Sequence, residues 1–276
     1  MKITSVELHP DNSTDVAVFS FRDPQRLNPY NVKGIDGLDA DAIIPRYYRG
    51  SGGSSLYNFT LEKRQVVIQV QLNPNFANNQ SYSDLRDALY KKIASSRTGS
   101  VQLQFKNGAN VVAVLPGFIA KFESSHFDKT PTVQITINCD EPMLKSPTRV
   151  SPTFGPLSDW TIRDDLSTAP HGFIFDLILN YADSLIEITD PGDASWHFEI
   201  NPNGGFLVND HLYFSSETNN KYLYIVRAGN TINLIDAIFP GSVWPVMFPG
   251  ATRLGFSGYS HLTLQTFAWY TTYWGL

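Results

Sequence analysis

The alternation of apolar and polar positions in the first half of the chain is typical of β-strands. Residues 60–72 end in a regular alternation that predicts a half-buried strand. Further strands are predicted at 100–105, 110–123 and 132–140. The dipeptide Asn107-Gly108 separates the first two of these three and is a strong hairpin signal. We therefore predict an antiparallel meander in this half.

One segment of the first half, residues 82–97, has helical spacing instead. Its apolar residues recur every four positions and so share one face of a helix. Ser81, with Asp84 three residues later, resembles a capping box, and Gly99 suits a helix end. The predicted buried face consists of Leu85, Leu89 and Ile93.

Prolines predict a bend and a domain boundary. Pro116-Gly117 interrupts the strand at 110–123, which indicates a bulge or bend there. Further on, prolines recur every four or five residues, a density that central strands do not tolerate. We predict a first domain of residues 1–145, an extended linker of residues 146–158 and a second domain of residues 159–276. The boundary prolines are Pro142, Pro147, Pro152 and Pro156.

The second domain shows short strands and no helix of useful length. Gly, Asn and Asp punctuate these strands, and Ala228-Gly229-Asn230 is expected to close one hairpin. Short strands at this spacing favour an antiparallel β-sandwich. The fold class is therefore mainly β: an α+β first domain, with one main helix on an antiparallel sheet, followed by a sandwich.

Composition and charge narrow the functional classes. The chain has 276 residues, of which only 17% are charged and 13% are aromatic, and this balance favours strands. Residues 1–148 hold 16 Lys and Arg against 14 Asp and Glu, a charge of +2. Residues 149–276 hold 5 against 12, a charge of −7. Neither half has a nucleic-acid footprint. The opposite charges are expected to help subunits pack, or simply to reflect an acidic solvated surface.

No motif predicts a cofactor, a metal or a membrane span. The glycine-rich stretch at 49–56 lacks the lysine of a phosphate loop, and the aspartates of 34–43 lack calcium-ligand spacing. The six histidines are scattered, and the single cysteine, Cys139, is expected to be a small core residue. The amino terminus lacks the apolar region of a signal peptide, so synthesis in the cytoplasm is expected.

An enzymatic site finds little support in the sequence. Asp164 and Asp165 are adjacent, so along a strand they would point to opposite faces rather than form a catalytic carboxylate pair. A G-x-S-x-G nucleophile elbow is missing from the sequence. A Ser/His/Asp constellation assembled from distant residues is the enzymatic alternative that stays open.

Aromatic residues are concentrated in the last segment, "TFAWYTTYWGL". On a strand, Trp269 and Tyr273 would share one face, while Tyr270 and Trp274 would share the other. Such residues fill a core or a subunit contact more often than they stack on sugar rings. We favour the core or contact interpretation and keep sugar binding as the alternative.

Segments of the first half resemble the distal tail proteins of bacteriophages. The stretches "LNPYNVKGIDGLDADAI" and "FTLEKRQVVIQVQLNPN" are similar to the family's amino-terminal domain, and the helix at 82–97 looks like the family's helix. The matching motif residues are Ile35, Gly37, Leu38, Asp39 and Arg64, then Gly117-Phe118-Ile119 and Cys139-Asp140-Glu141-Pro142.

The second half is similar to the galectin-like sandwich of the same family. The matching residues are Trp244-Pro245, Pro249-Gly250 and Leu254-Gly255-Phe256. The chain departs from the pattern at Ala251-Thr252-Arg253, where the family commonly has an asparagine.

The resemblance implies a non-enzymatic structural subunit of the phage tail tip, located in the virion. In this family the amino-terminal domains form a hexameric ring that joins the tail tube to the tail hub. The sandwiches project outward, toward receptor-binding proteins or host glycans. An alternative is a carbohydrate-binding module, and a further one is a tail-associated glycosidase or peptidase.

The resemblance and the sequence pattern together nominate two sets of residues. Within or near residues 28–60, a long mixed-charge stretch, we expect most of the ring contacts. The candidate ring-interface residues are Tyr30, Ile35, Leu38, Asp39, Arg46, Tyr47 and Arg64. The candidate contacts to a glycan or a partner are Trp196, Trp269 and Trp274.

Overall fold

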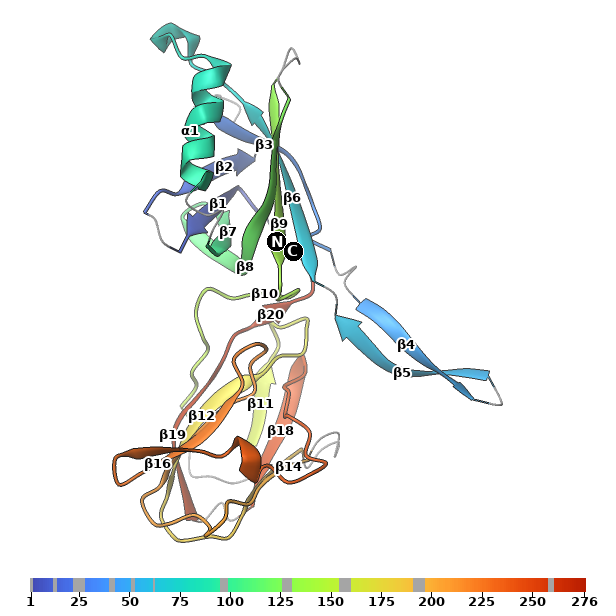
Figure 1. Cartoon of the computed structure of the whole chain (residues 1–276), viewed down its shortest axis with the longest axis vertical. Coiled ribbons are helices and arrows are strands. Elements are labelled where there is room, and N and C mark those ends of the chain that lie inside the picture. The colour runs from blue at the N-terminus through green and yellow to red at the C-terminus, as the bar shows by residue number, and fades with distance from the viewer. Residues whose placement is uncertain are drawn as a thin grey trace. The chain divides into compact units, whose positions relative to one another are not determined.

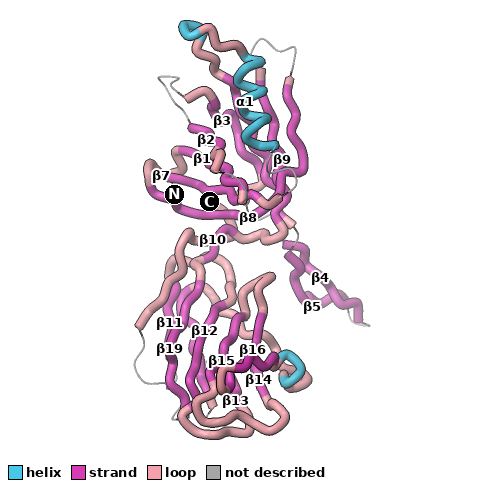
Figure 2. The backbone as a smooth tube through the Cα atoms, turned by 60° about the vertical axis from the view of Figure 1, so that its left-hand side comes forward, coloured by secondary structure: helices cyan, strands magenta, loops and turns pink. Residues whose placement is uncertain are grey.

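The computed structural model folds the chain into two compact units. Unit 1 comprises Met1–Pro147 together with Trp274–Leu276, and unit 2 comprises Thr148–Tyr273. Strands predominate in both units (Figures 1 and 2). The structure describes residues 2–11, 14–21, 28–39, 43–50, 53–61, 63–94, 99–125, 131–153, 160–190, 197–257 and 261–276; for 43–50, 53–61 and 160 it describes the backbone alone.

Unit 1 is built around a sheet that closes on itself. The strands follow the order β10-β8-β7-β1-β2-β3-β6-β9, and β8 also pairs with β9. Most neighbours are antiparallel, but β2 and β3 run parallel. The strands are β1 (Ser5–Pro10), β2 (Ala17–Phe21), β3 (Tyr30–Asp36), β6 (Arg64–Leu72), β7 (Val101–Asn107), β8 (Asn110–Ser124), β9 (Thr132–Cys139) and β10 (Leu144–Lys145).

The long strand β8 makes this closure possible. Its residues up to Gly117 pair with β7, and its residues from Phe118 onward pair with β9. The strand continues through Pro116-Gly117 and changes partner there, while its register shifts fall on either side. A Cβ atom on Gly117 would lie 2.8 Å from the carbonyl oxygen of Asn138 and 2.9 Å from Sγ of Cys139. The change of partner therefore requires a residue without a side chain.

Helix α1 (Tyr82–Ala94) packs against the sheet (Figure 1). Leu85, Leu89 and Ile93 are buried, as the spacing predicts. The capping box is confirmed: the backbone N–H of Asp84 donates to Oγ of Ser81 (3.2 Å), and that of Ser81 donates to Oδ2 of Asp84 (2.9 Å). Oγ of Ser81 also donates to Oδ2 of Asp84 (2.7 Å), and this bond, together with that from the Ser81 N–H, lowers the pKa of Asp84. A short 3₁₀ turn, η1 (Phe76–Asn78), lies between β6 and α1.

Strands β4 (Ile43–Gly50) and β5 (Gly53–Leu61) form a hairpin of their own. They pair antiparallel in a separate two-stranded sheet, with a register shift between Arg46 and Tyr47. The sequence pattern predicts neither this hairpin nor β1 to β3. Of the predicted strand at 60–72, residues 60 and 61 belong to β5 and the remainder forms β6.

Unit 2 is an antiparallel β-sandwich. Its two sheets have the orders β11-β18-β13-β14 and β17-β16-β15-β12-β19. The strands are β11 (Trp160–Asp164), β12 (Phe173–Leu179), β13 (Ile186–Thr189), β14 (His197–Ile200), β15 (His211–Ser215), β16 (Tyr222–Arg227), β17 (Asn230–Asn233), β18 (Gly250–Phe256) and β19 (Leu262–Trp269), with the 3₁₀ turn η2 (Ile235–Ala237) and the short strand β20 (Thr272–Tyr273).

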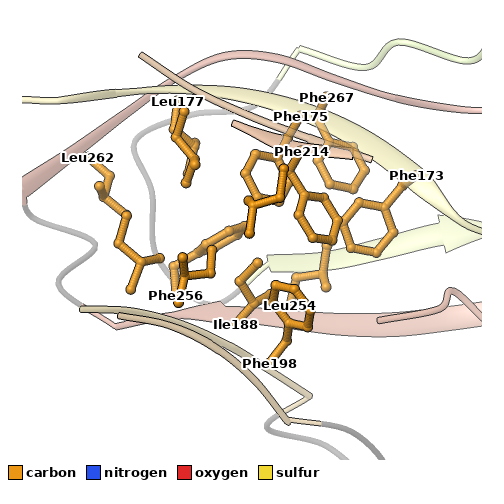
Figure 3. Packing of buried hydrophobic residues seen from close by; sticks show 14 of the residues in the cluster. Phe173, Phe175, Leu177, Ile188, Phe198, Phe214, Leu254, Phe256, Leu262 and Phe267 are labelled. Atoms are coloured by element: carbon orange, nitrogen blue, oxygen red, sulfur yellow. The ribbon is translucent and has the colours of Figure 1, made fainter. Parts of the chain in front are cut away.

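The core of unit 2 is rich in phenylalanine. Figure 3 shows side chains from both sheets meeting between the layers. Phe175 and Phe214 stack with centroids 4.6 Å apart, and Phe173 stacks on Phe267 at 5.1 Å. Inward residues alternate with outward ones along β12, β15 and β16, which is the pattern of a sheet packed on one side.

The predicted mainly-β fold class is confirmed, but the segment taken as a linker is different. In the described part of residues 146–158, Val150 pairs with Trp269, its N–H donating to that carbonyl at 2.8 Å. Arg149 binds Glu217 with two N–H groups. Residues from Thr148 onward are therefore tied to unit 2 rather than extended between domains. The last three residues, which the sequence analysis placed in the second domain, return to unit 1.

The change of partner at Gly117 is testable by substitution. We expect Gly117→Ala to lower the free energy of unfolding by about 1–3 kcal/mol, because the new methyl group overlaps the backbone of β9. Gly34→Ala in β3 is the matched control, since its Cβ would meet no atom within 4 Å. Urea denaturation of both variants measures the effect. Equal stability of the two would show that closure does not depend on Gly117.

Candidate functional site

Arg64, a predicted interface residue, lies inside unit 1. Arg64 is the first residue of β6 and is only 4% exposed. Nη1 donates to the carbonyl of Gly37 at 3.1 Å. Nε donates to the carbonyl of Pro142, and Nη2 donates to that of Trp274. The guanidinium group thus joins three segments that are far apart in the sequence.

The motif at 37–39 packs against the carboxy-terminal residues. Gly37 has φ +82°, and a Cβ there would lie 1.9 Å from the carbonyl oxygen of Gln65, so only glycine fits. A Cβ on Gly275 would lie 2.8 Å from the carbonyl oxygen of Leu38 and 3.4 Å from Cα of Asp39. The backbone of the last residues therefore runs directly against this motif.

The remaining candidate interface residues differ in accessibility. Tyr30 is buried; its hydroxyl donates to the carbonyl of Leu85 at 3.1 Å and anchors α1, and burial raises its pKa. Ile35 and Leu38 are half-buried, whereas Asp39 is exposed. Arg46 and Tyr47 lie on β4, whose backbone alone is described. Among the candidates with described side chains, the accessible ones are therefore concentrated at 35–39.

The three candidate tryptophans occupy three different situations. Trp269 is 3% exposed, in the core of unit 2, where Nε1 donates to Oδ2 of Asp164 at 2.7 Å. Trp274 is half-buried in unit 1, and its carbonyl accepts from Arg64. Trp196 lies outside the described residues. The two described side chains therefore do not form one common aromatic surface.

Asp164 is the centre of a buried polar cluster in unit 2. Its Oδ2 accepts from Oγ of Ser167 at 2.6 Å and from Trp269. Its Oδ1 accepts the backbone N–H of Ser167 at 3.1 Å. Oγ of Ser167 in turn accepts from the N–H of Thr272 at 3.0 Å. These bonds join Trp269 and Thr272, near the carboxy-terminal end of unit 2, to Asp164 at the end of β11 and to Ser167 just after it.

His171 completes a Ser/His/Asp group, but the geometry is not that of a catalytic triad. Nε2 of His171 lies 3.1 Å from Oδ2 of Asp164, off the angle of a good hydrogen bond. Ser167 donates directly to the carboxylate instead of to the histidine, and all three residues are buried. A nucleophile needs the histidine as its base and needs access to substrate. The group therefore supports structure rather than hydrolysis.

The other predicted chemical features have structural surroundings. Asp165 is exposed while Asp164 is buried, so the two carboxylates do face opposite ways. Cys139 is buried, and burial raises its pKa to about 12, which removes thiolate reactivity at neutral pH. Among the residues with described side chains, no three His, Cys, Asp or Glu are grouped to hold a metal ion. None of the described helices has the length and apolar character to cross a membrane.

Unit 2 also carries polar features that sequence reasoning missed. A cavity of about 410 Å³ is lined by Asn203, Arg227, Asn233 and Asp236, among others. Arg227 donates from Nε to Oδ1 (2.9 Å) and from Nη2 to Oδ2 (2.6 Å) of the buried Asp210. These bonds lower the pKa of that carboxyl against the opposing effect of burial. The outer face of the five-stranded sheet bears stacked aromatic rings from β15 and β16. The signal was present as aromatic residues at every second position in "HLYF" and "YLYI".

Comparison with solved structures identifies the fold. The Dit protein of phage SPP1, described as a paradigm of the hub adsorption apparatus of phages that infect Gram-positive bacteria, matches with a TM-score of 0.62 and 13% identity; the match covers 96% of this chain and 98% of that one. Two structures of the phage p2 baseplate in its activated conformation, with Sr and with Ca, match at 0.45 and 10% identity, over 97% of each chain.

The comparisons with sequences found nothing. No protein-family model matches this chain, and no curated protein matches it either. The resemblance to distal tail proteins is therefore confirmed at the level of the fold, through the structure of SPP1 Dit and over nearly the whole chain.

The role of Arg64 is testable by a substitution that keeps its length. We expect Arg64→Met to lower the free energy of unfolding by about 2–4 kcal/mol, because buried carbonyls lose their charged donor. Faster amide hydrogen exchange at 37–39 would show that stability is lost where these residues contact the carboxy terminus. Arg86→Met, at an exposed pair with Asp87, is the control and should cost less than about 1 kcal/mol. Similar costs for both variants would contradict this role.

Burial of His171 predicts a pH dependence. Desolvation is the largest cause that lowers its pKa from 6.5, against the opposing backbone bond to Gly172 and the charge of Asp164. Below pH 6.5 the imidazole of His171 binds a proton in the unfolded chain but stays neutral in the folded unit, so the free energy of unfolding falls as the pH drops. In His171→Gln this loss should shrink, while the exposed His197→Gln should keep it. Thermal unfolding between pH 7.5 and pH 5 distinguishes them, and identical slopes would rule out His171 as a cause.

Proposed function

We propose that this chain, which has the fold of phage SPP1 Dit, is a non-enzymatic structural subunit of a bacteriophage tail tip. In this proposal six copies form a ring that joins the tail tube to the tail hub, and the protein resides in the virion. The observation that supports it most directly is the fold shared with a hub protein over 96% of this chain. Unit 1 builds the ring, and unit 2 serves receptor-binding proteins or the host surface.

The β4–β5 hairpin is the feature of unit 1 that most needs a partner. A two-stranded hairpin alone is marginally stable in water, and this one shares no sheet with other described strands. A closed ring uses a head-to-tail contact, in which one patch of each subunit meets a different patch of the next. The hairpin supplies one patch in this proposal, and the exposed surface around Asp39 supplies another candidate.

Two candidate residues take a different part in this proposal. Tyr30 and Arg64 are buried within their own unit, where they anchor α1 and the carboxy terminus. They would support the ring indirectly, by fixing the backbone of 35–39 from which Ile35, Leu38 and Asp39 reach the surface. Arg46 and Tyr47 stay candidates for direct contact through the hairpin.

The buried polar group of unit 2 supports the non-enzymatic part of the proposal. Asp164, Ser167 and His171 are buried and use their polar atoms to hold backbone and Trp269 in place. A hydrolase would need such groups at an accessible surface, with the base between nucleophile and carboxylate.

The ring is tested by mass photometry and electron microscopy. Six copies of 30.9 kDa give about 185 kDa (6 × 30.9), and we expect this species alone or with tube and hub proteins. Replacing residues 43–61 with a short Gly-Ser link should abolish it while the far-ultraviolet spectrum retains a folded sheet. Tyr181→Ala, on an exposed loop of unit 2, should leave the ring intact. A chain that stays monomeric with every partner would overturn the proposal.

A further inference from the structure

The outer face of the five-stranded sheet carries a polar row that runs across the whole sheet. Cross-strand pairing aligns Asp176 of β12 with Thr266 of β19 on one side and with Tyr213 of β15 on the other. Tyr213 pairs with Tyr224 of β16, which pairs with Asn233 of β17. Each strand of this sheet therefore contributes one hydrogen-bonding side chain to the same line.

Aromatic rings stack along the middle of this row. Tyr213 and Tyr224 lie nearly parallel, with centroids 4.9 Å apart and planes at 16°. His211 stacks on Tyr213 at 6.5 Å, and Tyr222 lies 5.6 Å from Tyr224. All four are half-buried. Because Tyr213 and Tyr224 cover one another's faces, less ring face is left for apolar contact, and their hydroxyl groups gain weight as hydrogen-bonding partners.

Asp176, which is half-buried in the row, has an unsatisfied oxygen. Its Oδ1 is shielded from water, and no described residue donates a hydrogen bond to it. Burial raises the pKa of this carboxyl, and the charge of His211 opposes the shift only in part. Such an oxygen destabilises a fold unless a ligand satisfies it. Rotation about the broad terminal torsion exchanges the two carboxylate oxygens, so a ligand hydroxyl has a route to this acceptor.

We propose that this row binds a neutral saccharide chain. Sugar hydroxyls both donate and accept hydrogen bonds, and the row offers a carboxylate, an amide and several hydroxyl groups in one line. Unit 2 holds 5 Lys and Arg against 12 Asp and Glu, so a phosphate-bearing polymer is repelled. The site does not include Trp269, which is buried in the core of unit 2. The inference rests on the proposed role of unit 2 at the host surface and not on the ring.

The test uses the full chain and a defined set of ligands. The probes are hexasaccharides of glucose, of galactose and of N-acetylglucosamine, with glycerol teichoic acid as the anionic comparison. Amide chemical shifts of ¹⁵N-labelled protein should move at 176, 211–213 and 222–224 with at least one neutral probe. In Asp176→Asn the affinity should fall by about 10-fold or more, because a hydrogen bond to a charged acceptor is lost.

Thermal unfolding without ligand separates a binding role from a folding role. Asp176→Asn should unfold at the same or a higher temperature, since the variant removes the charge from a half-buried carboxylate whose Oδ1 lacks a donor. Tyr181→Ala, an exposed tyrosine against His261, is the matched control and should bind like the wild type.

Several outcomes would overturn the saccharide site. They are the absence of shifts with every neutral probe, tighter binding of teichoic acid than of any neutral probe, and unchanged affinity in Asp176→Asn. Shifts in the row on adding a hub or receptor-binding protein, without any sugar effect, would assign the face to a protein partner instead. Mass photometry of the same samples reports ring formation separately, so failure of the sugar site and failure of the ring are distinguishable.

Discussion

The fold of unit 1 depends on one buried cation. Removing a guanidinium group from water costs several kcal/mol, and three charge-assisted bonds to main-chain carbonyls, each worth about 1.5–3 kcal/mol, offset that cost. The acceptors of Arg64 lie 27, 78 and 210 residues away in the sequence. Because carbonyls are fixed to the backbone, these bonds specify where three chain segments pass. A side chain that merely filled the space would not impose that arrangement.

This constraint explains why the motif around Ile35–Asp39 is linked to an arginine in the sequence. The carbonyl of Gly37 accepts a hydrogen bond from Arg64, and the missing side chain of Gly37 leaves room for the backbone of Gln65. The following residues, Leu38 and Asp39, pack against Gly275. The resemblance to distal tail proteins suggested a surface role for these residues. Their backbone also holds the end of the chain, while the side chain of Asp39 stays exposed. Unit 2 is therefore connected to unit 1 at both of its ends, as an insertion.

Local patterns predicted the elements whose signals lie within a few residues. The helix, its capping box and the Asn107-Gly108 hairpin follow from spacing alone, since each depends on contacts three or four positions apart. Strands β1, β3, β4 and β5 were missed because Pro10, Gly34, Pro45 and Gly53 weaken their strand signals, whereas β2 contains no such residue. The partners of Arg64 and of Trp269, the latter 105 residues from Asp164, have no local signature at all.

The two faces of the five-stranded sheet show how the same period-two pattern serves two purposes. Inward positions of β12, β15 and β16 fill the phenylalanine core, where Phe175 and Phe214 stack. Any polar residues at the outward positions would satisfy the fold, yet these positions align a carboxylate and two tyrosines in register. The phenylalanine core packs without them, and Asp176 adds a carboxylate oxygen that lacks a hydrogen-bond donor. A feature that the fold does not need, and that costs it stability, is better explained by binding than by folding.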